Sequence, residues 1–383
     1  MTEYRVLFEG TDKQVVVPVG TLLSEAARLA GIDVLQPCGG QGRCGRCAVK
    51  VIEGSVRRRS TLRLSAEDIA NGYALACQTV VEGDVTVFIP PQEKIERRLT
   101  TDLTVAEVTV PVGYNPQLDQ TIHRVTLQLK EPSMDDQTDD LSRLLTALKQ
   151  QKGFDQVQIS LSVMRKMGSV LRNGNWLVTA ILDLQEETIE TQRLIDLIPG
   201  WVDLDEPVWG AAVDIGTTTV TFWLVDLITG QVKAQASEYN GQIARGEDVI
   251  SRIVFASKDG GQEEMRRLVL DTINKLAEMV CKRANRHNPQ INPVTPDHIV
   301  KMIVSGNSTM THLFLGLPAA SIRLSPFVTT VNHVPLLTAS QVGIAIHPDA
   351  TVDCLPGVAS YVGSDITAGV LSSGMDDTSK ITL

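Results

Sequence analysis

The sequence has no uninterrupted apolar run of the roughly 18 residues that a membrane-spanning helix needs, although 43% of its residues are hydrophobic. Its first residues do not show the basic and then apolar pattern of a secretion signal, so we expect a cytoplasmic protein without a membrane partner. Histidine is also scarce, with six residues and no closely spaced pair. A metal site built from histidines is therefore not expected.

Positive charge is in deficit, because the chain carries a formal net charge of −10. Residues 1–91 contain equal numbers of basic and acidic side chains, so the excess negative charge lies entirely beyond residue 91. This balance argues against nucleic acid as a partner. The basic run Arg57-Arg58-Arg59 is expected in a solvated loop, with a docking patch for an acidic protein as the alternative.

Cysteine is sparse as well, but four of the six cysteines lie between residues 38 and 77, with the spacing C-x5-C-x2-C-x29-C. They are Cys38, Cys44, Cys47 and Cys77. A binuclear iron–sulfur cluster takes four thiolates. The loop around such a cluster must turn sharply, and the four glycines between Cys38 and Cys47 permit positive φ angles there. The pattern predicts a [2Fe–2S] cluster held by these four residues.

Two other interpretations of this stretch are open. A structural zinc site also uses four cysteines, but it usually has two closely spaced pairs, and this chain has one such pair, Cys44 and Cys47. The glycines also spell G-x-G-x-x-G, the dinucleotide-binding pattern, which requires a strand before it and a helix after it. Here a strand-like run, Ala48–Ile52, follows the loop, so the dinucleotide match is interpreted as coincidental.

The cysteine spacing resembles that of the [2Fe–2S] ferredoxin family, with the five-residue first gap of its adrenodoxin-like branch. The resemblance implies low-potential transfer of single electrons and a β-grasp fold for residues 1–91. The expected elements are strands at Arg5–Phe8, Val15–Val19 and Cys47–Ile52, a helix at Thr21–Leu29, a helix that begins at Ser65, and a hairpin of Thr79–Val81 and Val85–Ile89 turning at Glu82-Gly83-Asp84.

Residues 92–120 are predicted to be a linker that passes into a strand at Leu103–Val108, and residues 121–207 a small α/β domain. In that domain we expect strands at His123–Leu129 and Trp176–Leu182 and helices at Leu141–Leu148 and Leu161–Leu171. The remaining cysteines, Cys281 and Cys354, are predicted to be core thiols.

A second motif, Asp214-Ile215-Gly216-Thr217-Thr218-Thr219, lies between two apolar strand patterns. Gly216 permits close approach of a ligand, the neighbouring N–H groups can form an anion-binding nest, and the hydroxyls of Thr217 and Thr218 add donors. Asp214 can hold Mg²⁺ through water. An ordinary hairpin turn is the alternative interpretation.

Residues 208–383 resemble the first lobe of the actin-like ATPase superfamily, whose first phosphate loop has this pattern. Two later strand-to-helix turns, Ser305–Thr309 and Gly363–Asp365, belong to the same resemblance. No second D-x-G phosphate loop and no adenosine-site segment are recognised after Asp214, so we expect the first lobe only and a chain truncated at its C-terminus. The expected fold class is multidomain α+β and α/β: a β-grasp ferredoxin domain, a small α/β middle domain, and one lobe of an actin-like (ribonuclease H-like) fold.

This order of parts resembles the ATP-dependent reductive activators of corrinoid proteins. The resemblance implies a protein that reduces corrinoid Co(II) to Co(I) and uses ATP and Mg²⁺ at an incomplete site. Its implied partners are a corrinoid protein and a low-potential electron donor, with a homodimer possible. The alternatives are a simple [2Fe–2S] electron carrier with a non-functional ATPase remnant, and the electron-input domain of a reductase. Arg43 and Arg46, beside the cysteines, are expected to raise the cluster's reduction potential.

Overall fold

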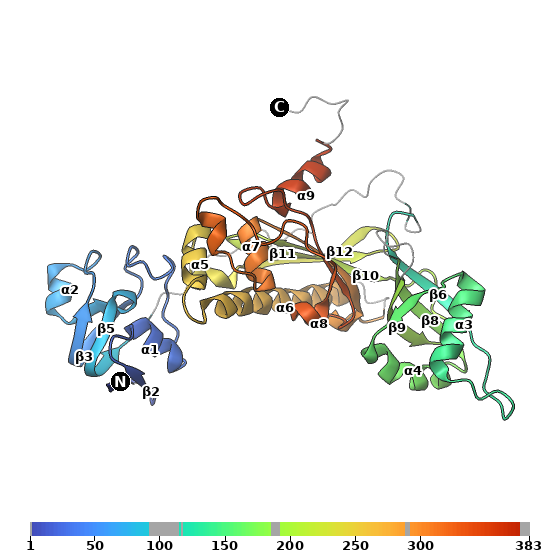
Figure 1. Ribbon diagram of the computed structural model, residues 1–383, viewed down its shortest axis with the longest axis horizontal. Helices are drawn as coiled ribbons and strands as arrows, with labels where there is room; N and C mark the ends of the chain where they lie inside the picture. The colour runs from blue at the N-terminus through green and yellow to red at the C-terminus, as the bar shows by residue number, and fades with distance from the viewer. Residues whose placement is uncertain (1, 92–114, 116–117, 185–191, 288–291, 376–383) are drawn as a thin grey trace.

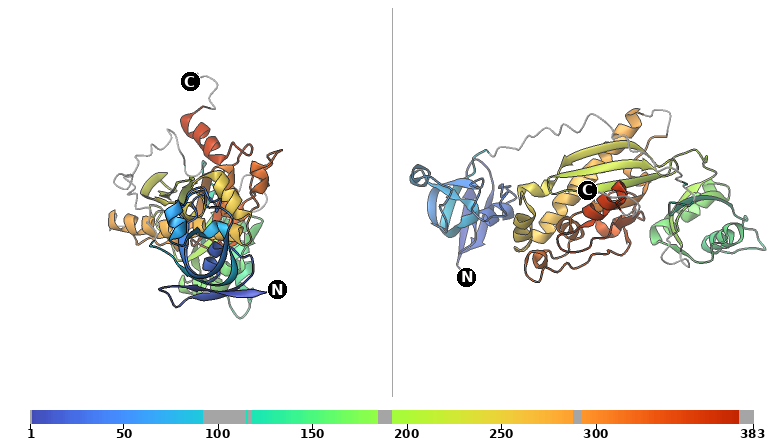
Figure 2. Two further views of the ribbon diagram at one scale, coloured as in Figure 1. Left: turned by 90° about the vertical axis from the view of Figure 1, so that its left-hand side faces the viewer. Right: turned by 90° about the horizontal axis from the view of Figure 1, so that it is seen from above.

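The computed structural model describes residues 2–91, 115, 118–184, 192–287 and 292–375. Within these residues the strands form sheets of five, six and four strands. The views in Figures 1 and 2 agree that the five-stranded and four-stranded sheets lie at opposite ends of the six-stranded one. Mixed sheets with separate hydrophobic cores confirm the expected multidomain α+β and α/β fold class.

The N-terminal sheet has the β-grasp arrangement, with strand order β2-β1-β5-β3-β4 and helix α1 (Leu23–Leu29) packed on it. Its first and last long strands run parallel in the centre of the sheet. Helix α2 (Ala66–Ala70) begins at Ser65, whose side chain caps the Asp68 N–H. The strands are β1 (Glu3–Phe8), β2 (Gln14–Pro18), β3 (Ala48–Arg58), β4 (Tyr73–Leu75) and β5 (Thr79–Phe88).

The predicted hairpin at Glu82-Gly83-Asp84 is wrong, because β5 continues through these residues as one strand. Its partner β3 shifts register twice, on either side of Gly54, and this absorbs the turn-like sequence without reversing the chain. Gly54 has φ +106°, and a Cβ there would lie 2.0 Å from the Asp84 carbonyl oxygen. The predicted loop at Arg57-Arg58-Arg59 is also wrong for its first two residues, which belong to β3.

The second sheet has the order β6-β8-β9-β7, and helices α3 and α4 cover one face of it through their apolar sides. Asp139 and Ser160 cap these two helices, and Gly153 ends α3 in the left-handed conformation. The predicted strand at Leu103–Val108 lies outside the described residues. The elements are β6 (Ile122–Gln128), α3 (Asp140–Lys152), β7 (Val157–Ile159), α4 (Leu161–Asn173), β8 (Leu177–Asp183) and β9 (Gln192–Pro199).

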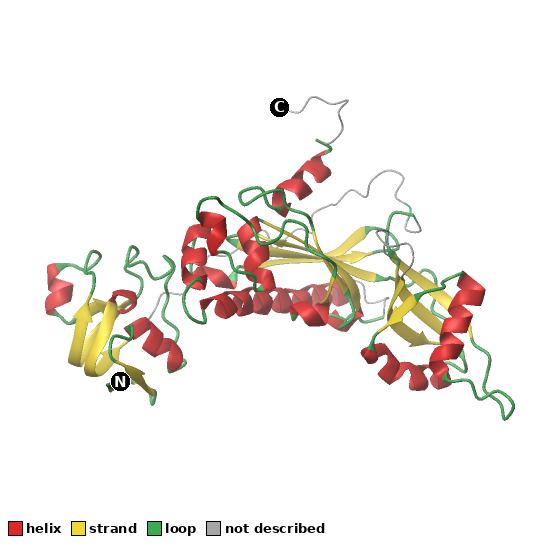
Figure 3. Ribbon diagram, viewed as in Figure 1, coloured by secondary structure: helices red, strands yellow, loops and turns green. Residues whose placement is uncertain are grey.

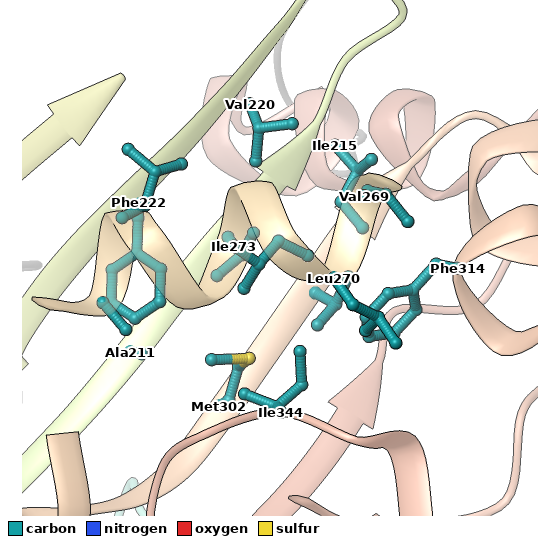
Figure 4. Close-up of a cluster of buried hydrophobic side chains, with 14 of the residues drawn as sticks. Ala211, Ile215, Val220, Phe222, Val269, Leu270, Ile273, Met302, Phe314 and Ile344 are labelled. Atoms are coloured by element: carbon teal, nitrogen blue, oxygen red, sulfur yellow. The ribbon is translucent and has the colours of Figure 1, made fainter. Parts of the chain in front are cut away.

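The central sheet has the order β12-β11-β10-β13-β15-β14, in which the first three strands form an antiparallel meander and β10, β13 and β15 run parallel. The long helix α6 lies along this sheet (Figure 3), where Ile273 and Leu270 meet Phe222 and Met302 in a dry core (Figure 4). The strands are β10 (Trp209–Ile215), β11 (Thr219–Asp226), β12 (Gln231–Tyr239), β13 (Ile299–Gly306), β14 (Leu337–Thr338) and β15 (Thr351–Cys354). The helices are α5 (Val249–Ala256), α6 (Gly261–His287), α7 (Ser308–Leu315), α8 (Ala339–Val342) and α9 (Ser364–Ser373).

Candidate iron–sulfur and phosphate sites

The loop between α1 and β3 has a backbone that only glycine adopts at low cost. All four of its glycines, Gly39, Gly40, Gly42 and Gly45, have φ between +66° and +80°. Backbone N–H groups of the loop point at sulfur: the Cys38 sulfur accepts from the N–H groups of Gln41, Arg43 and Cys44, among others. This is the cradle that an inorganic cluster with acceptor sulfurs requires.

The four cysteines converge as two pairs. The Sγ atoms of Cys38 and Cys44 lie 3.3 Å apart, and those of Cys47 and Cys77 lie 3.2 Å apart. In the part of the chain that the structure describes, no three potential ligand side chains converge on one point. Two pairs of thiols can serve two irons, whereas a single zinc ion needs all four ligands around one centre. The donor set therefore fits the [2Fe–2S] group better than zinc.

The thiol pair deepest in the domain is strongly polarised. The hydrogen bond between the Sγ atoms of Cys47 and Cys77 lowers the pKa of Cys47 to about 7 and raises the pKa of Cys77. Iron ligation requires thiolates, so the fold already favours the ionised form at one position of this pair. By contrast, burial raises the pKa of Cys281 and Cys354 to about 12, which is typical of core thiols.

The central lobe docks directly on the cluster loop. The Lys258 Nζ donates to the Gly39 carbonyl oxygen at 2.6 Å, and a Cβ on Gly39 would lie only 2.3 Å from the Ser251 carbonyl oxygen of α5. Behind this contact, Arg245 forms ion pairs with both Asp33 and Glu264. A cavity of about 310 Å³ remains between α1 and the start of α6. An interface so polar and incompletely filled is of the kind that can open.

The second motif forms a tight turn between β10 and β11. Two of its carbonyl oxygens accept hydrogen bonds from side chains of other segments, Asn240 and Arg252. Asn240 is fully buried and donates its side-chain N–H to the Gly216 oxygen at 2.9 Å. The Asn307 side chain donates to the Thr217 hydroxyl at 3.2 Å. Among the described residues, no acceptor takes the backbone N–H groups of Thr217 and Thr218. These two donors can therefore bind an anion.

Two carboxylates stand beside this turn. Asp214, near the end of β10, accepts a hydrogen bond from the Ser305 hydroxyl at 2.8 Å. Burial raises the pKa of Asp214, and the nearby charge of Asp365 raises it further. The Gly363–Asp365 turn packs on the Ser305–Thr309 turn so closely that a Cβ on Gly363 would lie 2.5 Å from the Asn307 Cα. The structure thus brings together three stretches that are far apart in the sequence.

Helix α5 contacts both sites through two neighbouring residues. The turn of the second motif, residues 216–218, is called the phosphate turn below. Arg252 on α5 is fully buried and donates to the Thr217 carbonyl oxygen in this turn. The next residue along the helix toward its start, Ser251, contacts Gly39 of the cluster loop. Helix α5 therefore contacts the cluster loop through its backbone and the phosphate turn through Arg252. The sequence alone does not mark Arg252, Lys258 or Asn240, because the role of each depends on a contact with a distant loop.

The geometry defines an iron–sulfur protein in which a ferredoxin domain is docked on one lobe of an actin-like fold. Three protein-family models match successive parts of the chain. They are described as "2Fe-2S iron-sulfur cluster binding domain" at residues 6–82, "RACo linker region" at 115–203 and "RACo middle region" at 209–378. From residue 115 onward the chain is therefore similar to the RACo family. In the described residues, no helix combines the length and apolarity needed to cross a bilayer.

Individual relatives agree with this assignment. The corrinoid activation enzyme RamQ of Eubacterium limosum is 27% identical over 375 residues, which are 97% of this chain and 56% of that protein. A solved structure titled as a reductive activator for corrinoid, iron-sulfur protein matches with a TM-score of 0.60 and 37% identity, over 100% of this chain and 59% of that one. The chain thus spans little more than half the length of these relatives.

A further match concerns the first domain alone. A glycine betaine monooxygenase reductase from Pseudomonas aeruginosa is 34% identical over 85 residues, which are 22% of this chain and 23% of that protein. Beyond the ferredoxin domain, the chain matches RACo regions instead. The similarity to this reductase subunit therefore concerns the ferredoxin domain alone, and the reductase alternative stays a prediction.

Replacing Asp214 with asparagine separates its effect on stability from its effect on ligand binding. The folded pKa lies above the ordinary value of 3.8, so ionisation costs stability as the pH rises through this raised value. We expect Asp214→Asn to unfold at a slightly higher temperature than the unsubstituted chain at pH 7, and the difference to vanish below pH 3.8. The affinity for Mg²⁺ and nucleotide that the D-x-G-T-T pattern predicts should also fall in this variant, as measured by calorimetry. A lower unfolding temperature at pH 7 would contradict this account.

Proposed function

We propose that this chain is the electron-delivering and phosphate-binding part of a reductive activator that returns corrinoid cobalt from Co(II) to Co(I). Cys38, Cys44, Cys47 and Cys77 are its cluster ligands, and the bound cluster supplies one-electron chemistry at low potential. The printed names of RamQ and of the matched structure support the corrinoid substrate. The partners are then a corrinoid protein and a low-potential donor in the cytoplasm, with the chain acting as a homodimer.

The observation that carries this proposal is the contact of α5 with both sites. Reduction of Co(II) to Co(I) is uphill, and each 59 mV on a one-electron step costs about 1.4 kcal/mol. A coupling device must therefore relate ligand binding at one place to electron transfer at another. Arg252 contacts the phosphate turn and Ser251 contacts the cluster loop, so a displacement of α5 changes both.

Each residue of the phosphate site has a task in this proposal. The N–H groups of Thr217 and Thr218 bind a phosphate, and the Thr218 hydroxyl, which is exposed, adds a donor. Asp214 holds Mg²⁺ through water. The positive charge of the ion offsets the repulsion between Asp214 and Asp365. Arg252 responds to a change in the conformation of the turn, because its guanidinium donates to the Thr217 carbonyl oxygen.

The test uses the full chain after anaerobic reconstitution with iron and sulfide. We expect a brown protein with a rhombic EPR signal after dithionite reduction, and a change in the midpoint potential of the cluster when Mg·ATP is added. An intact cluster together with no ATP binding in calorimetry would favour the simple electron carrier instead. Colourless protein that retains zinc would refute the cluster itself.

Replacing Gly39 with alanine should detach the ferredoxin domain from the lobe. The new Cβ would collide with the Ser251 carbonyl oxygen, and the positive φ of +66° adds about 1 kcal/mol of backbone strain. We expect the radius of gyration measured by small-angle X-ray scattering to increase while the cluster absorbance is retained. Gly10→Ala is the matched control, because Gly10 also has positive φ but no atom lies within 4 Å of its Cβ position. Equal behaviour of the two variants would contradict the docked arrangement.

A further inference from the structure

The cluster loop has one edge that the lobe does not cover. Of the four cluster cysteines, Cys44 is partly exposed, whereas Cys38, Cys47 and Cys77 are buried. Gly39, on the other side of the loop, is in contact with Ser251 of the lobe. Electron transfer weakens steeply with distance, so a partner that exchanges electrons with the docked form must approach at the Cys44 edge.

Three exposed arginines, Arg43, Arg59 and Arg63, lie on or beside the cluster loop, and we call them the arginine rim. Arg63 is anchored to the loop, because its Nε donates to the Arg43 carbonyl oxygen at 2.6 Å. Arg59 is linked to the cluster loop through Gln78. Its backbone N–H donates to the Gln78 carbonyl oxygen, and the Gln78 side chain donates to the Gly40 carbonyl oxygen of the loop at 2.8 Å. Leu62, between these arginines in the sequence, is 78% exposed.

The charges of the rim are not neutralised by ion pairs. Among the described residues, no carboxylate lies within 4.0 Å of the charged groups of Arg43, Arg59 or Arg63, although Asp248 of the lobe acts on Arg43 electrostatically from farther away. By contrast, Arg57 on the same domain is paired with Glu82 at 2.6 Å. Residues 1–91 are neutral in sum, so a positive rim implies a negative remainder and hence a charge asymmetry that orients an incoming protein.

We propose that the arginine rim is the docking face for an acidic electron-transfer protein, such as an acidic flavoprotein in its hydroquinone state. This inference rests on the proposed function, because it requires that the cluster carries electrons. One electron passes from the hydroquinone, which becomes the semiquinone, to the oxidised cluster, which becomes reduced, and no bond to either protein is formed. The rim supplies local attraction within a chain whose net charge of −10 would otherwise repel such a partner.

The experiment measures how fast an acidic flavodoxin hydroquinone reduces the cluster of the full chain in stopped flow. We expect Arg43→Gln and Arg59→Gln each to lower the second-order rate constant roughly 2–5-fold at low ionic strength, and the difference to disappear at high salt. The matched control is Arg57→Gln, which removes the same charge from the same domain but from an existing ion pair. It should change the rate constant far less.

The outcomes are distinguishable from failure of the proposed function. Dithionite reduction, followed by EPR, establishes beforehand that each variant carries a working cluster, and rates are expressed per cluster. If the unsubstituted chain forms no cluster, the proposed function fails and this inference fails with it. If the cluster is reduced by dithionite but the rim variants react with flavodoxin like the control, only the docking face is refuted. A monomer–dimer equilibrium that the rim substitutions abolish, seen in sedimentation, would assign the rim to a second copy of this chain and overturn the proposal.

Discussion

Replacing Cys77 with alanine abolishes the cluster, and we expect the reconstituted chain to lose its visible absorbance and its EPR signal completely. Cys77 is 2% exposed, and its Sγ lies 3.2 Å from that of Cys47, so the substitution removes one of the two thiols of the buried pair. The iron served by this pair would be left with one thiolate. Because metal binding and folding are coupled, the loop with its four positive-φ glycines should also lose its fixed conformation.

The matched control for this substitution is Cys281→Ala. Cys281 is equally buried, but its pKa is raised by burial alone, without the contribution from a neighbouring thiol that acts on Cys77. We expect that variant to lose about 1–2 kcal/mol of stability through the small cavity it leaves and to keep the full cluster content. Iron and acid-labile sulfide analysis measures the difference. A Cys77→Ala chain with two irons and an unchanged EPR signal would show that another residue is the fourth ligand.

The sequence predicts most strongly those features that local chemistry dictates. Cysteine spacing and intervening glycines mark the cluster loop, because ligation and positive φ angles are properties of short segments. The helices at Leu161 and Ser364 begin where their polar N-terminal residues or glycines indicate. Asp214 and its turn are recognisable for the same reason, since an apolar strand that ends in D-x-G-T-T is a local pattern.

The features that the sequence does not predict depend on contacts between segments that are far apart in the chain. The segment around Gly83 has the composition of a hairpin turn, yet it continues as a strand because β3 pairs with the residues on both sides of it, Val81 and Val85, across a register shift. The docking of the lobe on the cluster loop is likewise invisible in either segment alone. Lys258 is an ordinary surface lysine in the sequence, and its contact with Gly39 arises only from the tertiary arrangement.

The largest effect expected at the phosphate side concerns Arg252, which is a buried cation without an ion pair among the described residues. Burial lowers the pKa of its guanidinium to about 10, and the charge of Asp248 offsets only part of this. The guanidinium compensates by donating to the oxygens of Gly246, Gln242 and Thr217. Burial of the charged Arg252 guanidinium lowers the stability of the lobe. We infer that this residue instead links a change in the turn to a displacement of α5.

Replacing Arg252 with methionine should therefore have two separable consequences. The three oxygens lose their donor, which destabilises the lobe by roughly 2–4 kcal/mol, although removal of a buried charge offsets part of this. More importantly, we expect Mg·ATP still to bind but no longer to change the midpoint potential of the cluster. Arg252→Lys is the milder variant, because it keeps the charge and volume but cannot reach three acceptors with a planar fork.

The control for both substitutions is Arg267→Met on α6, where the side chain is 59% exposed and forms an i,i+4 ion pair with Asp271. An exposed pair of this kind contributes about 0.5 kcal/mol or less, so both stability and the ATP effect should survive. Redox titrations with and without Mg·ATP, combined with calorimetric binding, separate loss of binding from loss of coupling. If Arg252→Met binds ATP and shows the same change in potential as the unsubstituted chain, then α5 does not transmit the signal through this side chain, and the two sites communicate by another route.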